Sequence, residues 1–143
     1  MPKTYSSIWI HTIWTTKERN PLLARNFRIP LCSRIRENAM QKGFIIDMIN
    51  GVEDHLHGLI HLLPSQSVAE VMKQIKGASS HWINENGLVK IKFNWQQGYG
   101  ALSVSPSQID SIRNYIKNQE QHHKHWKLED ELQKFQFLDK KNP

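Results

Sequence analysis

The order of strand-like and helix-like segments constrains the fold of this chain more than any other feature of its sequence. Runs of aromatic and β-branched residues indicate strands, and capping and stop signals indicate helices. The expected strands are residues 5–16, 44–49, 55–63 and two short ones within 90–105; the expected helices are 22–42, 68–86, about 107–125 and 129–137. This order predicts an α+β fold: a ferredoxin-like antiparallel sheet with helices on one face, plus a C-terminal helix that bears a tyrosine.

Local signals set several of these boundaries. Asn50-Gly51 is expected to form a tight turn after the second strand, with residues 52–54 completing the connection. Ser67 and Glu70 have the spacing of a capping box, so the next helix should begin directly after Ser67. A proline at position 30 indicates that the first helix could restart there.

The third strand contains His55-Leu56-His57, a pattern with possible chemistry. Successive strand side chains point to opposite faces, so the two imidazoles should share one face, with roots roughly 7 Å apart. At that separation they can converge on one metal ion. Alone the signal is weak, because two histidines on a strand more often have no such role.

The tyrosine of the 107–125 helix could supply the other half of such a site. Tyr115 and Gln119 are four residues apart and should share a helix face. A phenol is a poor nucleophile at neutral pH, and a divalent metal that polarises a phosphodiester would help it. An amide beside it could be a metal ligand. Without the histidine strand, ordinary helix packing would be the better interpretation of this tyrosine.

Composition indicates which class of partner the protein binds and in which cellular compartment it is found. The single cysteine, Cys32, excludes an internal disulfide and a cysteine zinc cluster, and this suits a cytoplasmic protein. No apolar run approaches membrane-spanning length and no signal-peptide core is expected. The net charge is +6, most of it within the first 100 residues, which favours nucleic acid over a neutral partner.

Four blocks of the sequence, taken together, resemble the single-tyrosine HUH transposases of small, insertion-sequence-200-like elements. These are residues 13–23, the 54–59 segment Asp-His-Leu-His-Gly-Leu, residues 95–105, and the 115–123 segment that begins Tyr-Ile-Lys-Asn-Gln. The resemblance implies one transposase domain over residues 1–143 that cleaves and rejoins single-stranded DNA through a 5′-phosphotyrosine. It implies that Tyr115 is the nucleophile, that His55 and His57 bind the metal, and that Gln119 is the third protein ligand.

The resemblance also implies the cofactor and the partners. Two imidazoles with amide and phosphate oxygens suit Mg²⁺ or Mn²⁺, and the nitrogen ligands favour Mn²⁺. The DNA is expected to carry a hairpin, and the protein to be a homodimer in which the tyrosine helix often completes the partner's site. Basic side chains are expected to bind DNA phosphates; the candidates are Lys17, Arg19, Arg25, Arg28, Lys90, Lys92 and Lys117.

Three other functions remain open at this point. A domesticated nickase or a REP-associated relative would share the chemistry without mobility. A ferredoxin-like module could bind nucleic acid without catalysis. A metal phosphohydrolase could use the histidines without the tyrosine. Several residues of suitable type are expected to be bystanders, namely Tyr5, Tyr99, His61, His122, His123, Trp82, Trp95 and Trp126.

Overall fold

A four-stranded antiparallel sheet with strand order β2-β3-β1-β4 forms the centre of the structure. The computed structural model describes residues 3–122 and 128–134. The strands are β1 (Ile8–Thr15), β2 (Ile45–Val52), β3 (His55–Leu62) and β4 (Gly100–Val104). The helices are α1 (Arg25–Gln41), α2 (Val68–Glu85), α3 (Ile109–Lys117), α4 (Gln119–His122) and α5 (Leu128–Lys134), with 3-10 turns at Lys17–Arg19 and Pro106–Gln108. Element order and sheet order confirm the predicted ferredoxin-like α+β class.

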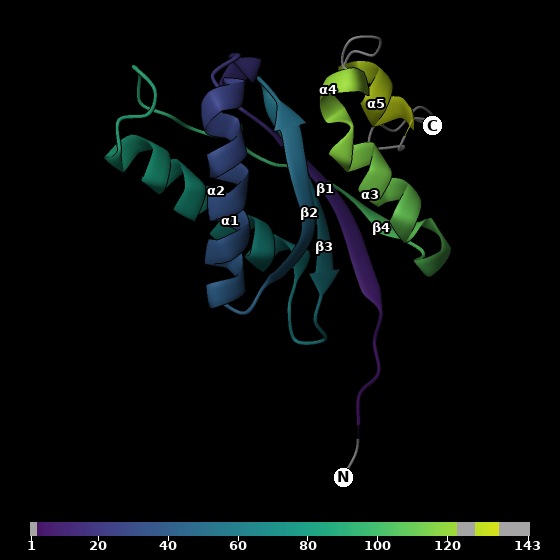
Figure 1. Cartoon of the computed structure of the whole chain (residues 1–143). Helices are drawn as coiled ribbons and strands as arrows, with labels where there is room; N and C mark the ends of the chain where they lie inside the picture. Colours follow the sequence, from purple (N-terminus) through teal and green to yellow (C-terminus); the bar gives the residue numbers. More distant parts are fainter. Residues whose placement is uncertain (1–2, 123–127, 135–143) are drawn as a thin grey trace, which may run out of the picture.

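The larger core lies between the sheet and the helix pair α1 and α2, which cover one face (Figure 1). Trp14 of β1 and Leu56 and Ile60 of β3 point to this side, and each is at most 2% exposed. Leu31 of α1 and Met72 of α2 pack against them and are fully buried. Leu56 therefore anchors the histidine strand from behind, as its alternation with the histidines predicts.

A smaller core on the opposite face holds α3 (Figure 1). Leu59 of β3 and Val104 of β4 pack against Ile112 and Ile116 of that helix. The alternation of β3 places His55 and His57 on the same face as Leu59. The two histidines therefore face the tyrosine helix rather than the larger core.

The predicted turn at Asn50-Gly51 is wrong, because β2 continues to Val52. Gly51 pairs with Leu56 inside the hairpin, and a Cβ atom there would lie 2.2 Å from the His55 carbonyl oxygen. Glycine is therefore present for close approach of two strands and not for a turn. The connection that remains is Glu53-Asp54, which places Asp54 directly before the histidine strand.

The segment 90–105 contains one strand, β4, instead of the two predicted; its earlier part makes only an isolated bridge between Trp95 and Thr16. The backbone of Phe93 finds its partners on α2. The side chain of Asn84 accepts from the Phe93 N–H at 2.6 Å and donates to its carbonyl at 2.9 Å. These bonds satisfy the peptide groups that a strand neighbour would otherwise have to satisfy.

Of the other local signals, the helix cap is confirmed and the restart at Pro30 is wrong. The Ser67 hydroxyl accepts from the Glu70 N–H at 3.1 Å, which caps α2 as predicted. Helix α1 runs through Pro30 without the suggested restart. In the described part of the chain, no helix is long and apolar enough to cross a membrane.

Candidate active site

The two histidines of β3 lie side by side on the face of the sheet that α3 covers. Both side chains are fully buried, and their ring centroids are 5.2 Å apart at an interplanar angle of 67°. The strand alternation thus predicts their common face correctly. Their burial removes the simplest alternative, that they are two solvent-facing histidines.

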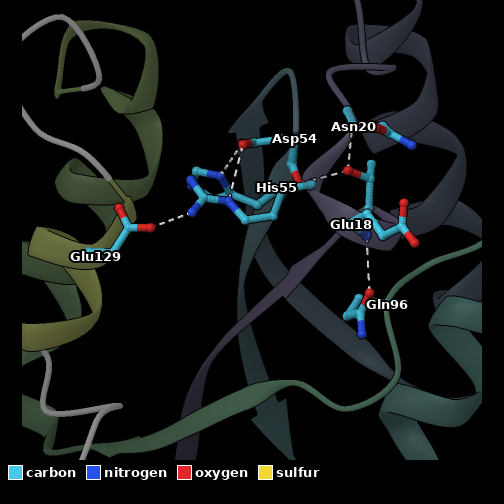
Figure 2. Close-up of polar contacts among 8 residues, drawn as sticks. Glu18, Asn20, Asp54, His55, Gln96 and Glu129 are labelled. Atoms are coloured by element: carbon cyan, nitrogen blue, oxygen red, sulfur yellow. Dashed lines mark hydrogen bonds and ion pairs between the residues drawn. The ribbon is translucent and has the colours of Figure 1, made fainter.

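A carboxylate fixes the orientation of His55. The imidazole donates from Nδ1 to Oδ1 of Asp54 at 2.7 Å, and Arg19 approaches the other carboxylate oxygen at 3.4 Å. In Figure 2, Asp54 and His55 lie next to each other and Glu129 approaches from α5. Partial burial raises the pKa of Asp54, but the hydrogen bond and charge of His55 and the charge of Arg19 together lower it. The carboxyl group therefore stays ionised and holds a proton on Nδ1, so Nε2 of His55 is the nitrogen suited to a metal.

The turn that presents Arg19 is strained. Glu18 and Arg19 have φ angles of 57° and 56°, a left-handed conformation that few residues other than glycine adopt. The Glu18 N–H donates to Oε1 of Gln96 at 3.1 Å, and the Arg19 N–H donates to the Thr16 carbonyl at 2.9 Å. The surrounding bonds thus hold a costly backbone conformation, a feature that clusters at functional sites. Arg19 also pairs with Glu129, so it connects the histidine strand to α5.

Two polar contacts fasten the tyrosine helix to β2. The amide of Asn50 donates to the carbonyls of Ile116 and Lys117, at 3.1 Å each. At a bulge in the same strand, Asp47 accepts from the Arg113 guanidinium at 2.7 and 3.0 Å. Since both contacts involve polar side chains of one strand, they fix the position of α3 along the sheet as well as its distance from it.

Tyr115 lies against the histidines of its own chain. Its ring centroid is 5.6 Å from that of His57 at an interplanar angle of 80°, and the side chain is only 8% exposed. The other two tyrosines are placed differently: Tyr5 is 86% exposed ahead of β1, and Tyr99 is 41% exposed in the loop before β4.

The predicted continuous helix over 107–125 is wrong in detail. Helix α3 ends at Lys117, Asn118 leaves the helical conformation, and α4 begins at Gln119. The Asn50 amide takes the last carbonyls of α3, which allows the helix to end there. Residues 123–125 lie outside the described part of the chain.

Gln119, the first residue of α4, nevertheless contacts the tyrosine helix. Its side chain is fully buried, and its amide nitrogen donates to the Tyr115 carbonyl at 3.4 Å. Among the described residues, its Oε1 atom is buried without a hydrogen-bond partner. A buried amide oxygen without a partner costs about 1–3 kcal/mol, which a bound cation or water would relieve.

The basic candidates fall into two groups. Arg28 is buried, and its guanidinium donates to the Leu23 carbonyl at 2.6 Å and to Glu120 at 2.7 Å. Arg25 is exposed and pairs with the same carboxylate at 3.0 Å, and Arg19 pairs as described above. The remaining candidates are exposed on the surface, namely Lys17, Lys90, Lys92 and Lys117.

The sequence interpretation missed two residues of the site. Asp54 carried a local signal, an acid directly before the first histidine. His11 of β1 is fully buried, and its Nε2 atom is 2.9 Å from Nδ1 of His57. His11 and His57 are 46 residues apart, so only the register of β1 against β3 could have brought them together.

Three of the predicted bystanders have partners away from the proposed site. The ring of His61 stacks on Trp9 at 4.5 Å and 4°, and the Trp95 indole donates to Ser79 inside the larger core. Trp82 is half-buried under the guanidinium of Arg34 at 5.6 Å. His123 and Trp126 lie outside the described residues.

Comparisons with known proteins bear on this arrangement. A family model described as "Transposase IS200 like" matches residues 4–119. The ISDra2 transposase TnpA of Deinococcus radiodurans is 28% identical over 114 residues, which cover 76% of this chain and 81% of that protein. A solved candidate transposase of Deinococcus radiodurans R1 superposes with a TM-score of 0.66 at 26% identity, covering 83% of this chain and 96% of the other.

A second solved structure shares the fold. It is a REP-associated tyrosine transposase bound to a REP hairpin, with a TM-score of 0.59 at 17% identity over 89% of this chain and 76% of the other. The family match spans both histidines, the tyrosine and the glutamine. On this match, the chain belongs to the IS200-like transposase family.

Proposed function

We propose that this protein is a metal-dependent transposase of single-stranded DNA, with Tyr115 as nucleophile and with His55, His57 and Gln119 as metal ligands. The observation that carries the proposal is the 5.6 Å approach of the Tyr115 ring to His57. A binding module has no use for a tyrosine packed against paired histidines, and a simple phosphohydrolase has no use for the tyrosine.

The residues at the site fit a divalent cation. No three His, Cys, Asp or Glu side chains converge as a metal cluster among the described residues, so the candidate set is two imidazoles and one amide. The buried Oε1 atom of Gln119, which lacks a hydrogen-bond partner in that part of the chain, supports this set. Two nitrogens and one oxygen leave further positions for phosphate oxygens, as suits Mg²⁺ or Mn²⁺.

The proposed reaction exchanges one phosphodiester for another. The Tyr115 oxygen attacks the phosphorus, the bond from phosphorus to the 3′ oxygen breaks, and a 5′-phosphotyrosine and a free 3′-hydroxyl result. The phenol gives up one proton and the departing oxygen takes one, so protons balance. A bound metal would supply charge stabilisation on the phosphate. A 3′-hydroxyl attacking the phosphotyrosine reverses the exchange and rejoins the strand, so no ATP is needed.

The DNA is proposed to carry a hairpin, since a relative of the same fold is known bound to one. The exposed Lys17, Lys90, Lys92 and Lys117 are proposed phosphate contacts, which would make binding weaken with salt. A homodimer is proposed from the two edge strands of the sheet, β2 and β4, since edge strands need protection from uncontrolled pairing. Light scattering should give twice the chain mass of 16.8 kDa; a monomer at working concentration would contradict the dimer.

The decisive experiment is a covalent trapping assay with a hairpin oligonucleotide and Mn²⁺. The wild-type protein should form an adduct that survives denaturing electrophoresis, and Tyr115→Phe should bind the DNA but form none. Tyr99→Phe is the matched control and should retain the adduct. His55→Ala and His57→Ala should abolish cleavage, as should a chelator. An adduct from Tyr115→Phe, or full cleavage in chelator, would refute the proposal.

A further inference from the structure

His11 has an unusual position for a residue outside the proposed ligand set. It lies on β1 with its side chain fully buried, and its Cα partner on β3 is Leu59. The next pair on the same face joins Ile13 to His57, so His11 and His57 are diagonal neighbours. Their ring centroids are 5.1 Å apart at 31°, with His11 Nε2 at 2.9 Å from His57 Nδ1.

Two imidazole nitrogens at that distance share one proton, with one ring donating and the other accepting. If Nε2 of His57 binds the metal, as in the proposed function on which this inference rests, that nitrogen carries no proton. The proton of the neutral ring is then on Nδ1, and Nε2 of His11 has to accept it. The opposite assignment would leave His57 with a proton on its metal-facing nitrogen and would prevent binding.

We propose that His11 is a positioning residue of the metal site: its Nε2 accepts the Nδ1–H of His57 and so selects the tautomer and ring orientation that bind the ion. The relation repeats on the other ligand, where Asp54 takes the Nδ1–H of His55 at 2.7 Å. Each histidine of the pair is thus oriented by its own partner, a carboxylate for one and a neutral imidazole for the other.

His11 is a partner of the site and not a third ligand. His11 contacts Nδ1 of His57, which is not the ring nitrogen proposed to bind the metal. The ring of His11 also packs edge-on to Tyr115, with centroids 6.2 Å apart. Because a bulky residue is needed for that packing, the test has to separate loss of the acceptor from loss of volume.

Three substitutions of the full-length protein make that separation, with free Mn²⁺ followed by electron paramagnetic resonance in the absence of DNA. In His11→Gln the amide reaches about as far as Nε2 and can still accept, so Mn²⁺ affinity should stay close to wild type. In His11→Asn the side chain is too short for its amide to reach His57. In His11→Phe the hydrogen-bond acceptor is lost while the volume of the side chain is kept. Both should weaken Mn²⁺ binding about 10- to 100-fold, the usual effect of losing such a partner. His61→Gln removes a histidine of β3 on the same face of the sheet and should leave Mn²⁺ affinity unchanged.

The outcomes distinguish this inference from the proposed function. If His57→Ala binds Mn²⁺ as tightly as wild type, the proposed metal site is wrong. If His57→Ala loses binding while His11→Phe and His11→Asn keep it, only the role of His11 is overturned. Circular dichroism melts confirm that each variant is folded.

A measurement on the unmodified protein covers the case in which the variants do not fold. With Mg²⁺ bound, two-bond nitrogen–proton spectra of the histidine rings should show His57 protonated on Nδ1 and His11 unprotonated on Nε2. The reverse pattern on this pair would overturn the inference without any substitution.

Discussion

Arg28 offers the sharpest test of how α4, the short helix after the tyrosine helix, is held against the rest of the protein. Its side chain is 3% exposed, and it bonds the Leu23 carbonyl at 2.6 Å and Glu120 of α4 at 2.7 Å. Arg25 bonds the same carboxylate at 3.0 Å, but its side chain is 71% exposed. The two arginines therefore form a matched pair that shares one acid and differs in burial.

The magnitude follows from the contacts that Arg28→Met would remove. Two hydrogen bonds from a charged group contribute about 1.5–3 kcal/mol each, and the Leu23 carbonyl would lose its buried partner. The removal of a buried charge offsets part of this, since the Nε atom of Arg28 has no partner in the described residues. The net loss should be about 2–4 kcal/mol. Arg25→Met breaks an exposed ion pair and should cost at most about 1 kcal/mol.

Urea unfolding followed by circular dichroism measures both variants in the same buffer. For Arg28→Met we expect a lower unfolding midpoint at unchanged slope. We also expect a lower rate of adduct formation, because Arg28 holds Glu120 and the preceding residue of α4 is the proposed ligand Gln119. Equal midpoints for the two variants would refute the reasoning from burial. So would a normal midpoint for Arg28→Met with a loss of DNA affinity, since that result would make Arg28 a phosphate contact.

Three further predictions follow from single features of the structure. Gly51→Ala should destabilise the protein by at least about 2 kcal/mol in urea unfolding, because its Cβ would lie 2.2 Å from the His55 carbonyl oxygen. Burial raises the pKa of Cys32 to about 12, although the charge of a neighbouring arginine lowers it in part. The folded thiol should then resist alkylation at pH 9, and stability should fall as the pH rises above about 8.5, where only the unfolded thiol ionises. Mixing Tyr115→Phe with His57→Ala subunits should recover no adduct, since the tyrosine lies against its own histidines; recovery in proven heterodimers would contradict this arrangement in cis.

Two control variants accompany these measurements. Gly77 lies on helix α2, and a Cβ atom there would meet open space. Gly77→Ala, the control for Gly51→Ala, should therefore leave stability unchanged or raise it by up to about 1 kcal/mol. A normal unfolding midpoint for Gly51→Ala would contradict the prediction and show that the hairpin relaxes around the added methyl group. Cys32→Ala should remove the loss of stability above pH 8.5, and persistence of that loss would assign it to another group.

The sequence by itself determined the parts of this protein that depend on local pattern. Alternation along β3 placed His55 and His57 on one face and Leu56 on the other. The spacing of Ser67 and Glu70 set the start of α2, and the order of elements gave the ferredoxin-like class. These features depend on residues a few positions apart, where backbone geometry limits the possibilities.

Only the tertiary structure decided the features that depend on which strands and helices meet. Gly51 lies within a strand, and glycine is required there because the neighbouring strand approaches too closely for a side chain. The tyrosine helix can end at Lys117 because the amide of Asn50, far away in sequence, donates hydrogen bonds to its last two carbonyls. His11 meets His57 through the register of β1 against β3. Such contacts are set by long-range packing, and a local pattern carries no record of the partner that packing supplies.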